Sequence, residues 1–380
     1  MVQNEVKLLG NICEIGRGSS PRPINDMRYF EAGTIPWIKI ADATKSEKYL
    51  YETKEHVNEY GASFSRIMPK GSLIFSASGV SLGKPIILGV EGCIHDGWIY
   101  LNNFDKTILS EYLYYFLLTQ QKYFLNFSYG AAIQNINTDI MKGMPISLPS
   151  TKNQQKIVNI LSNYDDLIEN NNKRIKILEK MAQKIYKEWF VDFKFPNHEN
   201  ATFKQTDLGN EVMPKKGKNI TKATIKEGNV PVVAGGIEPA YYHNVPNTVA
   251  PVITVSASGA NAGYINLYYQ DIWASDCSYI DTTMTPYVYY YYLLLKHNQI
   301  KVTNMQRGAA QPHVYPQDLA QLKFDVPDEN VIKMFNGLIT PIFEQIANLT
   351  LKNTNLKQTR DLLLPRLISG EIDVENLEII

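Results

Sequence analysis

The sequence of 380 residues has no net charge and no long apolar run. Its 38 Lys and Arg balance 38 Asp and Glu, whereas a protein that binds nucleic acid by itself usually has a basic excess. The longest apolar stretch, Tyr287–Leu295, is rich in tyrosine and too short to cross a bilayer. The beginning, MVQNEVKLLG, lacks the charged-then-apolar pattern of a secretion signal. We therefore predict a folded cytoplasmic protein without a membrane segment.

Cysteine is scarce, with only Cys13, Cys93 and Cys277 in the chain. Three cysteines cannot all pair, and their spacing matches no set of metal ligands. The six histidines are scattered. We predict reduced, structural thiols, no metal site and no cofactor on this chain.

Catalytic motifs are also missing. Gly79–Lys84 has three residues between its glycines and a proline after its lysine, so it is not a phosphate-binding P-loop. The sequence contains neither G-x-S-x-G nor H-E-x-x-H. Ser76 stands near His95, but the second occurrence of the same motif, at Ser256, has no neighbouring histidine. We predict a non-catalytic chain.

What the chain does contain is a long internal repeat. Gly71–Leu101 and Pro251–Asp281 both carry Ser-Ala-Ser-Gly, at Ser76–Gly79 and Ser256–Gly259. Each copy continues into a tyrosine-rich helix candidate and then a Gly-Ala-Ala sequence, at Glu111–Phe124 and Gly130–Ala132 in the first copy and Pro286–His297 and Gly308–Ala310 in the second. Because each copy is large enough to bury its own core, the repeat indicates a duplicated domain rather than a solenoid.

Each copy is followed by a segment with a seven-residue apolar repeat. The first runs from about Asn153 to Phe190, and the second from about Glu329 to Ile368. Apolar residues recur in 4-3-4-3 steps, which predicts two coiled-coil helices. The predicted spacer residues on their seams are Ile157, Leu161, Ile168, Asn171, Leu178 and Trp189, and Phe335, Ile346, Asn353, Leu356 and Leu363.

The order of the segments predicts that these helices are antiparallel, because a second helix that packs along the first must run back. A pseudo-two-fold axis then pairs Asn171 with Asn353, Trp189 with Phe335, and Tyr164 with Arg360. Facing Asn side chains would fix the register. The seam is about 50 Å long at about 1.5 Å per residue, close to one to one and a half turns of DNA.

The predicted class is α+β, with two similar mixed α/β domains separated by a long antiparallel two-helix coiled coil in a pseudo-two-fold repeat. Short apolar runs bounded by Gly and Pro predict strands at Ser72–Ser76, Pro85–Val90, Trp98–Leu101, Pro145–Leu148, Val252–Ser256, Tyr264–Leu267 and Leu322–Val326. We place the first globule at residues 1–150, the central helix at 151–195, the second globule at 196–326, and the distal helix and tail at 327–380.

Loops of the globules carry side chains suited to DNA. Small polar residues beside glycine let a backbone approach a phosphate, and amide and guanidinium groups match adenine and guanine edges. The two copies differ most in these loops, as readers of different sequences would need. The candidates are Arg17, Ser19, Arg22, Ser78, Ser81, Lys84, Gln134 and Asn135 in the first copy, and Lys215, Lys216, Lys218, Lys222, Ser258, Asn261, Arg307, Gln311 and His313 in the second.

Over essentially its whole length the sequence resembles the DNA-specificity subunits of type I restriction–modification systems. The two long helices carry the resemblance, with the ending LLPRLISGEI at Leu363–Ile372 and the SASG and GAA-x-Q-N-I stretches. It implies two target recognition domains, each reading half of a split site on double-stranded DNA. The helices would be a ruler and a dock for two methyltransferase subunits, which bind S-adenosylmethionine. Further restriction and translocase subunits would use ATP and Mg.

Two other functions stay open on the sequence. A two-headed protein-interaction scaffold would use both globules to bind protein, and would show no steep salt dependence of duplex binding. A free-standing enzyme would turn over S-adenosylmethionine or ATP on the lone chain.

Overall fold

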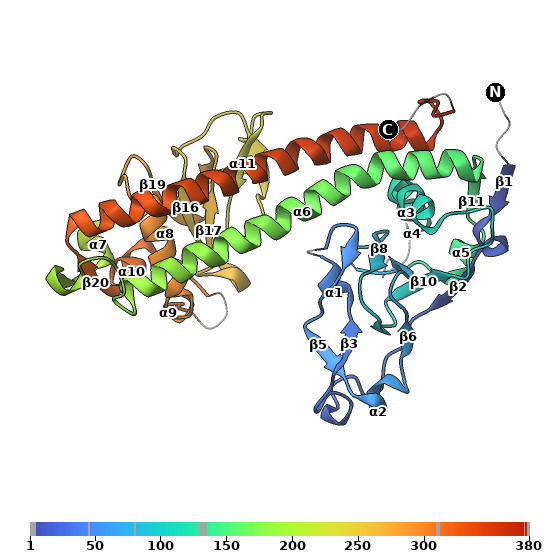
Figure 1. Ribbon diagram of the computed structural model, residues 1–380, viewed down its shortest axis with the longest axis horizontal. Coiled ribbons are helices and arrows are strands. Elements are labelled where there is room, and N and C mark those ends of the chain that lie inside the picture. The colour runs from blue at the N-terminus through green and yellow to red at the C-terminus, as the bar shows by residue number, and fades with distance from the viewer. Residues whose placement is uncertain are drawn as a thin grey trace. The chain divides into compact units, whose positions relative to one another are not determined.

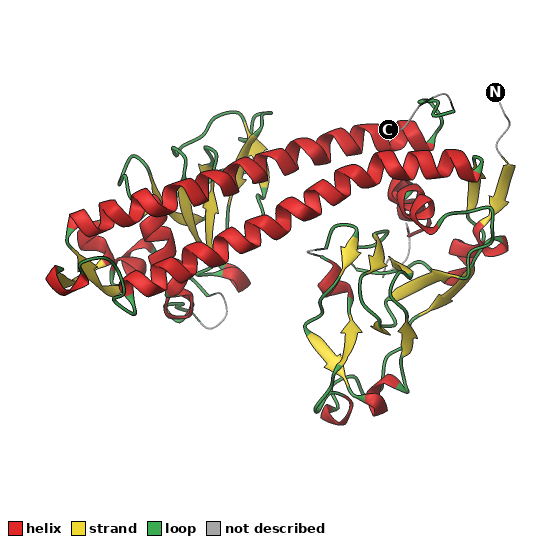
Figure 2. Cartoon of the chain, viewed as in Figure 1, coloured by secondary structure: helices red, strands yellow, loops and turns green. Residues whose placement is uncertain are grey.

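The computed structural model describes residues 5–377 except 45, 80, 129–134, 309–311 and 376. The chain forms two compact units, residues 1–170 with 352–380 and residues 171–351. Each unit combines a globule with part of the long helices α6 (Thr151–Phe190) and α11 (Glu329–Ile368), which are drawn green and red in Figure 1. Figure 2 shows that both globules mix strands with short helices. The predicted α+β class with two similar mixed domains is confirmed.

The described part of the first unit contains three sheets. The central one has the order β2 (Glu14–Arg17), β10 (Trp98–Asn102), β7 (Leu73–Ser76), β8 (Pro85–Leu88), β4 (Tyr49–Leu50). The next has the order β5 (Glu55–Val57), β3 (Ile35–Ile38), β9 (Gly92–Ile94), β6 (Arg66–Met68). β1 (Glu5–Leu8) pairs antiparallel with β11 (Pro145–Leu148), which joins the two ends of the globule where α6 begins.

The described part of the second unit repeats this plan. Its four-stranded sheet has the order β13 (Lys215–Lys216), β19 (Cys277–Asp281), β16 (Val252–Ser256), β17 (Ile265–Tyr268), which matches β2-β10-β7-β8. A smaller sheet contains β15 (Tyr241–His243), β14 (Val230–Val233) and β18 (Trp273–Ala274), and β12 (Phe203–Asp207) pairs with β20 (Lys323–Pro327). The duplication inferred from the sequence is therefore a duplication of sheet topology.

Short helices close the globules. In the first unit they are η1 (Leu9–Asn11), η2 (Met27–Tyr29), α1 (Ile40–Ala43), α2 (Glu59–Ala62), α3 (Ser110–Thr119), α4 (Gln121–Ser128) and α5 (Thr138–Lys142). In the second they are η3 (His198–Asn200), α7 (Leu208–Glu211), η4 (Gly259–Asn261), α8 (Val288–His297), α9 (Gln299–Thr303) and α10 (Pro316–Ala320).

The helix predicted over Glu111–Phe124 is interrupted. α3 ends at Thr119, and Gln120 leaves helical geometry before α4 starts. The turn keeps Phe124 in the core, where its ring centroid lies 4.6 Å from that of Phe75 on β7. Burial of an aromatic side chain against the sheet outweighs the continuity of a single helix here.

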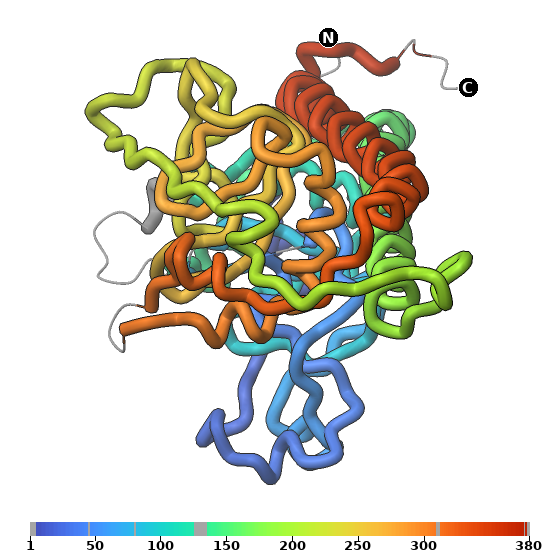
Figure 3. The backbone as a smooth tube through the Cα atoms, turned by 90° about the vertical axis from the view of Figure 1, so that its left-hand side faces the viewer, coloured from blue at the N-terminus to red at the C-terminus, as the bar shows by residue number. Residues whose placement is uncertain are grey.

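The long helices follow the predicted seam. α11 has the predicted bounds, and α6 begins two residues earlier than predicted. All eleven predicted spacer residues are buried or half-buried. In the second unit the rings of Trp189 and Phe335 lie 5.5 Å apart, so the end of α6 meets the start of α11, as an antiparallel pair requires. Figure 3, which looks onto this unit, shows the helices side by side. Asn171 and Asn353 are both buried, and their pairing stays a prediction.

One predicted contact of the seam is replaced by another. Arg360 was assigned to Tyr164, but its Nη1 lies 2.5 Å from Oδ1 of Asp165, the next residue of α6. The hydroxyl of Tyr115 on α3 donates to the other carboxylate oxygen at 2.5 Å. Leu364 is also buried more deeply than the predicted seam residue Leu363. Both differences arise because this end of α11 packs on the first globule as well as on α6.

Candidate nucleic-acid interface

The Ser-Ala-Ser-Gly segments form the same turn in both copies. Gly83 N donates to Ser76 O at 3.0 Å, and Gly263 N donates to Ser256 O at 2.9 Å. Glycine is needed at the start and end of each turn because the backbone there is left-handed. The φ values of Gly79, Gly83, Gly259 and Gly263 are +76°, +86°, +77° and +83°. The turn is therefore a shared scaffold set by the sequence motif.

A second segment crosses each turn and brings predicted site residues together. Ser78 forms an isolated β-bridge with Asn135, and Ser258 forms the same bridge with His313. Asn135 and His313 are thus equivalent positions with different side chains. Two other candidates, Gln134 and Gln311, lie outside the described residues.

The loops that follow β2 and β13 begin with the same backbone hydrogen bond to the neighbouring strand. Gly18 N donates to Trp98 O at 2.9 Å, and Gly217 N donates to Cys277 O at 2.8 Å. A Cβ on Gly18 would collide with the carbonyl oxygen of His95, and one on Gly217 would collide with that of Ser275. Because glycine has no Cβ, each loop can pack directly against the turn that precedes β10 or β19.

This match makes three pairs of positions equivalent, namely Arg17 with Lys216, Gly18 with Gly217, and Ser19 with Lys218. These equivalences are not apparent in the sequence, where the two loops differ in most of their side chains. The sequence signal that could align the two loops is a cation followed by glycine, at Arg17–Gly18 and at Lys216–Gly217. The scaffold is common to the copies, whereas the side chains it presents differ.

In the first unit the predicted residues Arg17, Arg22 and Asn135 converge on the turn that contains Asp96. Arg17 Nε donates to Asp96 O at 2.7 Å, and its Nη2 donates to Asn135 Oδ1 at 3.1 Å. Arg22 pairs with the Asp96 carboxylate. Ser19 lies beside them, with its hydroxyl donating to Phe64 O at 3.1 Å.

His95 lies in the same turn as a neutral ring. Burial lowers its pKa, and the nearby cations Arg22 and Lys39 add to this against the opposing effect of Asp96. Its Nδ1 accepts a hydrogen bond from Gly97 N at 2.9 Å, which a neutral ring allows. Although Nδ1 also lies 2.9 Å from Asp96 Oδ1, an ion pair there would need a protonated ring. The accepted hydrogen bond therefore describes this contact better.

Lys84, predicted to approach a phosphate, has its ammonium group directed to protein. Its Nζ donates to O of Ala43, the last residue of α1, at 2.8 Å and to Ser46 O at 2.6 Å. Burial lowers the pKa of this lysine. Lys84 thus ties its turn to the end of α1, whereas the second copy has Tyr264 at this position, and a phosphate contact stays a prediction.

In the second unit the predicted lysines are exposed on and after β13. They are Lys215, Lys216, Lys218 and Lys222. Lys222 Nζ lies 5.5 Å from the Tyr241 ring. Ser81 in the first copy and Asn261 in the second are half-buried at equivalent places in the SASG turns. Four of the predicted lysines lie on this segment, where the first copy has the predicted residues Arg17 and Arg22.

The remaining predicted residues of the second unit form a polar cluster. Arg307 exchanges backbone hydrogen bonds with His313, at 2.8 and 2.9 Å, and its side chain pairs with the buried Asp318. The Ser258 hydroxyl donates to the Asp276 carboxylate. Ser258, Arg307 and His313 therefore lie together at the SASG turn of this copy.

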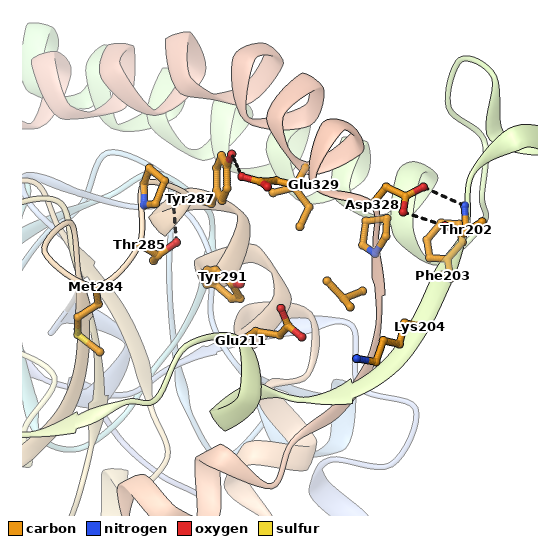
Figure 4. Close-up of a pocket in the computed structure, with 14 residues that line it drawn as sticks. Thr202, Phe203, Lys204, Glu211, Met284, Thr285, Tyr287, Tyr291, Asp328 and Glu329 are labelled. Atoms are coloured by element: carbon orange, nitrogen blue, oxygen red, sulfur yellow. Dashed lines mark hydrogen bonds between the residues drawn. The ribbon is translucent and has the colours of Figure 1, made fainter.

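A cavity of about 550 Å³ lies elsewhere in the second unit, among β12, β20, α8 and the start of α11 (Figure 4). Tyr287 donates to Glu329 at 3.1 Å, and Thr202 Oγ1 donates to Asp328 at 2.8 Å along its rim. Its lining comes from outer strands and helix starts rather than from the predicted DNA-binding loops.

At the equivalent place of the first unit, Gln154 of α6 is buried and hydrogen-bonded. Its buried amide accepts from Leu109 N at 2.9 Å and donates to Thr107 O at 2.7 Å. Ile332, at the matching position of α11, cannot make these bonds.

Within the described residues, no group of three or more His, Cys, Asp and Glu side chains could hold a metal ion. In the same part of the chain, no helix is long and apolar enough to cross a membrane. All three cysteines are buried, and burial raises the pKa of Cys13 and of Cys277 to about 12. Such thiols are unreactive.

Comparison with known proteins gives consistent matches. The family described as "Type I restriction modification DNA specificity domain" matches residues 1–180 and 197–360, one match for each copy. The type I restriction enzyme MjaIX specificity subunit of Methanocaldococcus jannaschii is 27% identical over 416 residues, which cover 98% of this chain and 94% of that protein. A putative type I specificity subunit of Mycoplasma genitalium is 26% identical and covers 70% of this chain and 73% of its own length.

A solved structure shares the fold. The type I restriction–modification S subunit from M. genitalium has a TM-score of 0.58 at 19% identity, with 96% of this chain and 95% of that chain covered.

Proposed function

The chain belongs to the family of type I restriction–modification DNA specificity proteins, and from that premise we propose that each of its two units reads one half of a split DNA site. The helices α6 and α11 set the distance between the halves. We do not favour the alternative of a protein-interaction scaffold, because the side chains that differ between the two units are of the types that contact bases and phosphates.

The observation that carries the proposal is the duplicated interface. The SASG turn, its crossing segment and the loop after β2 or β13 share backbone geometry in both units. The side chains at equivalent positions differ, with Arg17 and Asn135 in one unit and Lys216 and His313 in the other. A common scaffold with exchanged surface chemistry is what two readers of different half-sites require.

The chain's partners follow from the same proposal. We assign the catalytic chemistry to other subunits, two methyltransferase subunits docked on the helices and further restriction and translocase subunits. S-adenosylmethionine, ATP and Mg would be bound there, so this chain acts as a non-catalytic reader, and a cytoplasmic location remains a prediction. Partners that add positive charge around the duplex would account for binding by a chain of zero net charge.

Exchange of one reader tests the proposal. Residues 1–150 would be replaced by the same segment of a related specificity protein, and methylated adenines mapped in cells that express the hybrid with its methyltransferase partner. We expect one half of the recognised site to change and the other half and the spacing to stay. A change in both halves, or no sequence preference at all, would contradict the proposal. The matched control exchanges residues 196–326 and should alter the opposite half.

A further inference from the structure

The described arginines near these turns differ in the groups that accept hydrogen bonds or ion pairs from their guanidinium groups. Arg22 pairs with Asp96, Arg28 with Asp26, and Arg307 with Asp318, so a carboxylate offsets each of these charges. Arg17 is held instead by uncharged acceptors, the carbonyl oxygen of Asp96 and the amide oxygen of Asn135. Its positive charge is therefore positioned without being paired with a carboxylate.

The bonds to Arg17 also fix the plane of its guanidinium group. Nε and Nη2 are anchored at 2.7 and 3.1 Å, which uses one side of the planar fork and two of its five N–H groups. Nη1 and Nη2 form the end of the fork, the edge that pairs with O6 and N7 of guanine in the major groove. A half-buried, anchored arginine loses little further freedom when it binds, which favours bidentate recognition.

The backbone beneath Arg17 is held as firmly as its side chain. Gly18 presses on the turn at His95, where no Cβ fits, and Arg17 itself pairs with Ile99 on β10. Asn135, the second anchor, is placed by its bridge to Ser78. Three segments far apart in the sequence thus converge to orient one side chain.

The second unit places a lysine on the same scaffold. Lys216 is equivalent to Arg17, and His313 replaces Asn135. A lysine is a point charge that suits a phosphate, whereas a planar fork suits a base edge. The substitution changes the chemistry at one position while the fold around it stays.

We propose that Arg17, oriented by Asn135 and the Asp96 carbonyl, reads a guanine in the half-site of the first unit. The inference rests on the proposed function, of which it names one specificity-determining residue. Lys216, at the equivalent position of the second unit, has no planar fork and cannot make the same contact.

The test uses the full chain assembled with its methyltransferase partner. Binding to a randomised duplex library first gives the wild-type recognition sequence. A first half-site without guanine overturns the inference, whereas a complex without any sequence preference overturns the proposed function. The half read by the first unit is identified by the exchange of residues 1–150.

Arg17→Lys then separates base reading from phosphate contact, because it keeps the charge and loses the fork. We expect preference for one guanine of the first half to fall about 5- to 150-fold, with the other positions unchanged. Arg28→Lys, in η2 and outside the predicted DNA-binding residues, is the matched control and should change no position. Equal weakening on all sequences would assign Arg17 to a phosphate, and an unchanged preference would equally overturn the inference.

A modified base gives a second readout that does not depend on any variant folding. Replacing the guanine by 7-deazaguanine removes the N7 acceptor and should weaken wild-type binding about ten-fold, as expected for one lost hydrogen bond to a charged donor. The same replacement should have little effect on the complex with the Arg17→Lys variant, because this variant already lacks the guanidinium group that would bind N7. Wild-type binding that is insensitive to the modification at every guanine of the first half contradicts the proposal.

Discussion

Single positions decide how closely the recognition loops can approach the sheets. At Gly18 and Gly217 the chain comes so close to a neighbouring carbonyl group that an added Cβ would collide with it. Neither needs glycine for a left-handed backbone, since their φ values are not positive. The requirement is one of space, and it is the same in both units although the flanking side chains are not.

Alanine at either glycine is expected to displace its loop. Gly18→Ala or Gly217→Ala should cost about 1–3 kcal/mol of unfolding free energy, because a fixed backbone carbonyl cannot move aside as a flexible side chain would. Specificity should be lost for one half-site only. The control is Gly337→Ala in α11, where a Cβ meets open space and stability should rise by up to about 1 kcal/mol. Equal effects of all three substitutions in denaturant unfolding would contradict this account.

The half-buried ring of His95 should make stability depend on pH. Its pKa is lowered in the folded state, so the unfolded state binds more protons as the pH falls below about 6.5, and stability drops there. His95→Asn should remove this component, so the wild type should lose stability relative to the variant between pH 7.5 and 5.5. A constant difference across that range would show that the ring does not titrate in this way.

At the scale of elements, the long helices are also walls of the globules. Ile157 and Leu161 of α6 and Leu364 and Leu367 of α11 belong to the core of the first unit, together with Tyr115 of α3. Asp165 and Arg360 meet at this junction, with side chains 3% and 13% exposed. Asp165 raises the pKa of Arg360 against the effect of burial, so the guanidinium group keeps its charge. The ion pair fixes α6, α11 and α3 together because each partner would be costly to bury alone.

Removing one partner of this ion pair should be far more damaging than removing an exposed one. Asp165→Ala is expected to cost about 3–5 kcal/mol of unfolding free energy, since it leaves the Arg360 charge without its carboxylate. Lys357 lies on α11, as Arg360 does, and forms an ion pair with Glu47 in which both side chains are about 40% exposed. Lys357→Ala should therefore cost less than about 1 kcal/mol of unfolding free energy. Similar losses for the two variants in denaturant titrations would refute the ranking.

For the whole molecule, the proposal makes helix length a determinant of the recognised spacing. Adding three heptads to each helix, after Asn172 and after Leu351, preserves the seam and adds about 31 Å at about 1.5 Å per residue. That is close to one turn of DNA, so each half-site should again face its reader across a gap about nine or ten base pairs wider. Methylome mapping should show both halves unchanged. An unaltered gap would exclude the ruler, and insertion into one helix alone should abolish recognition.

Periodic parts of the fold were predictable because their signals are local. The 4-3-4-3 pattern gave the bounds of α11 and nearly those of α6, and alternating apolar runs between Gly and Pro marked β7, β11 and β16. Short strands such as β4 and β13 carry two residues each and no period, so only pairing with β8 and β19 defines them. The break at Gln120 likewise depends on Phe75, which lies far away in the sequence.

The candidate site was likewise predictable from the sequence only in part. The sequence by itself determined that the chain is duplicated, that the copies share an SASG turn, and which loops carry cations and amides, because repetition and residue type are written along one dimension. Only the tertiary structure decided that Lys84 turns inward, that Arg360 meets Asp165, and that Arg17 is clamped by Asn135 and matched by Lys216. Those outcomes depend on which oxygen atoms lie within about 3 Å of a side chain, and segments distant in sequence supply them.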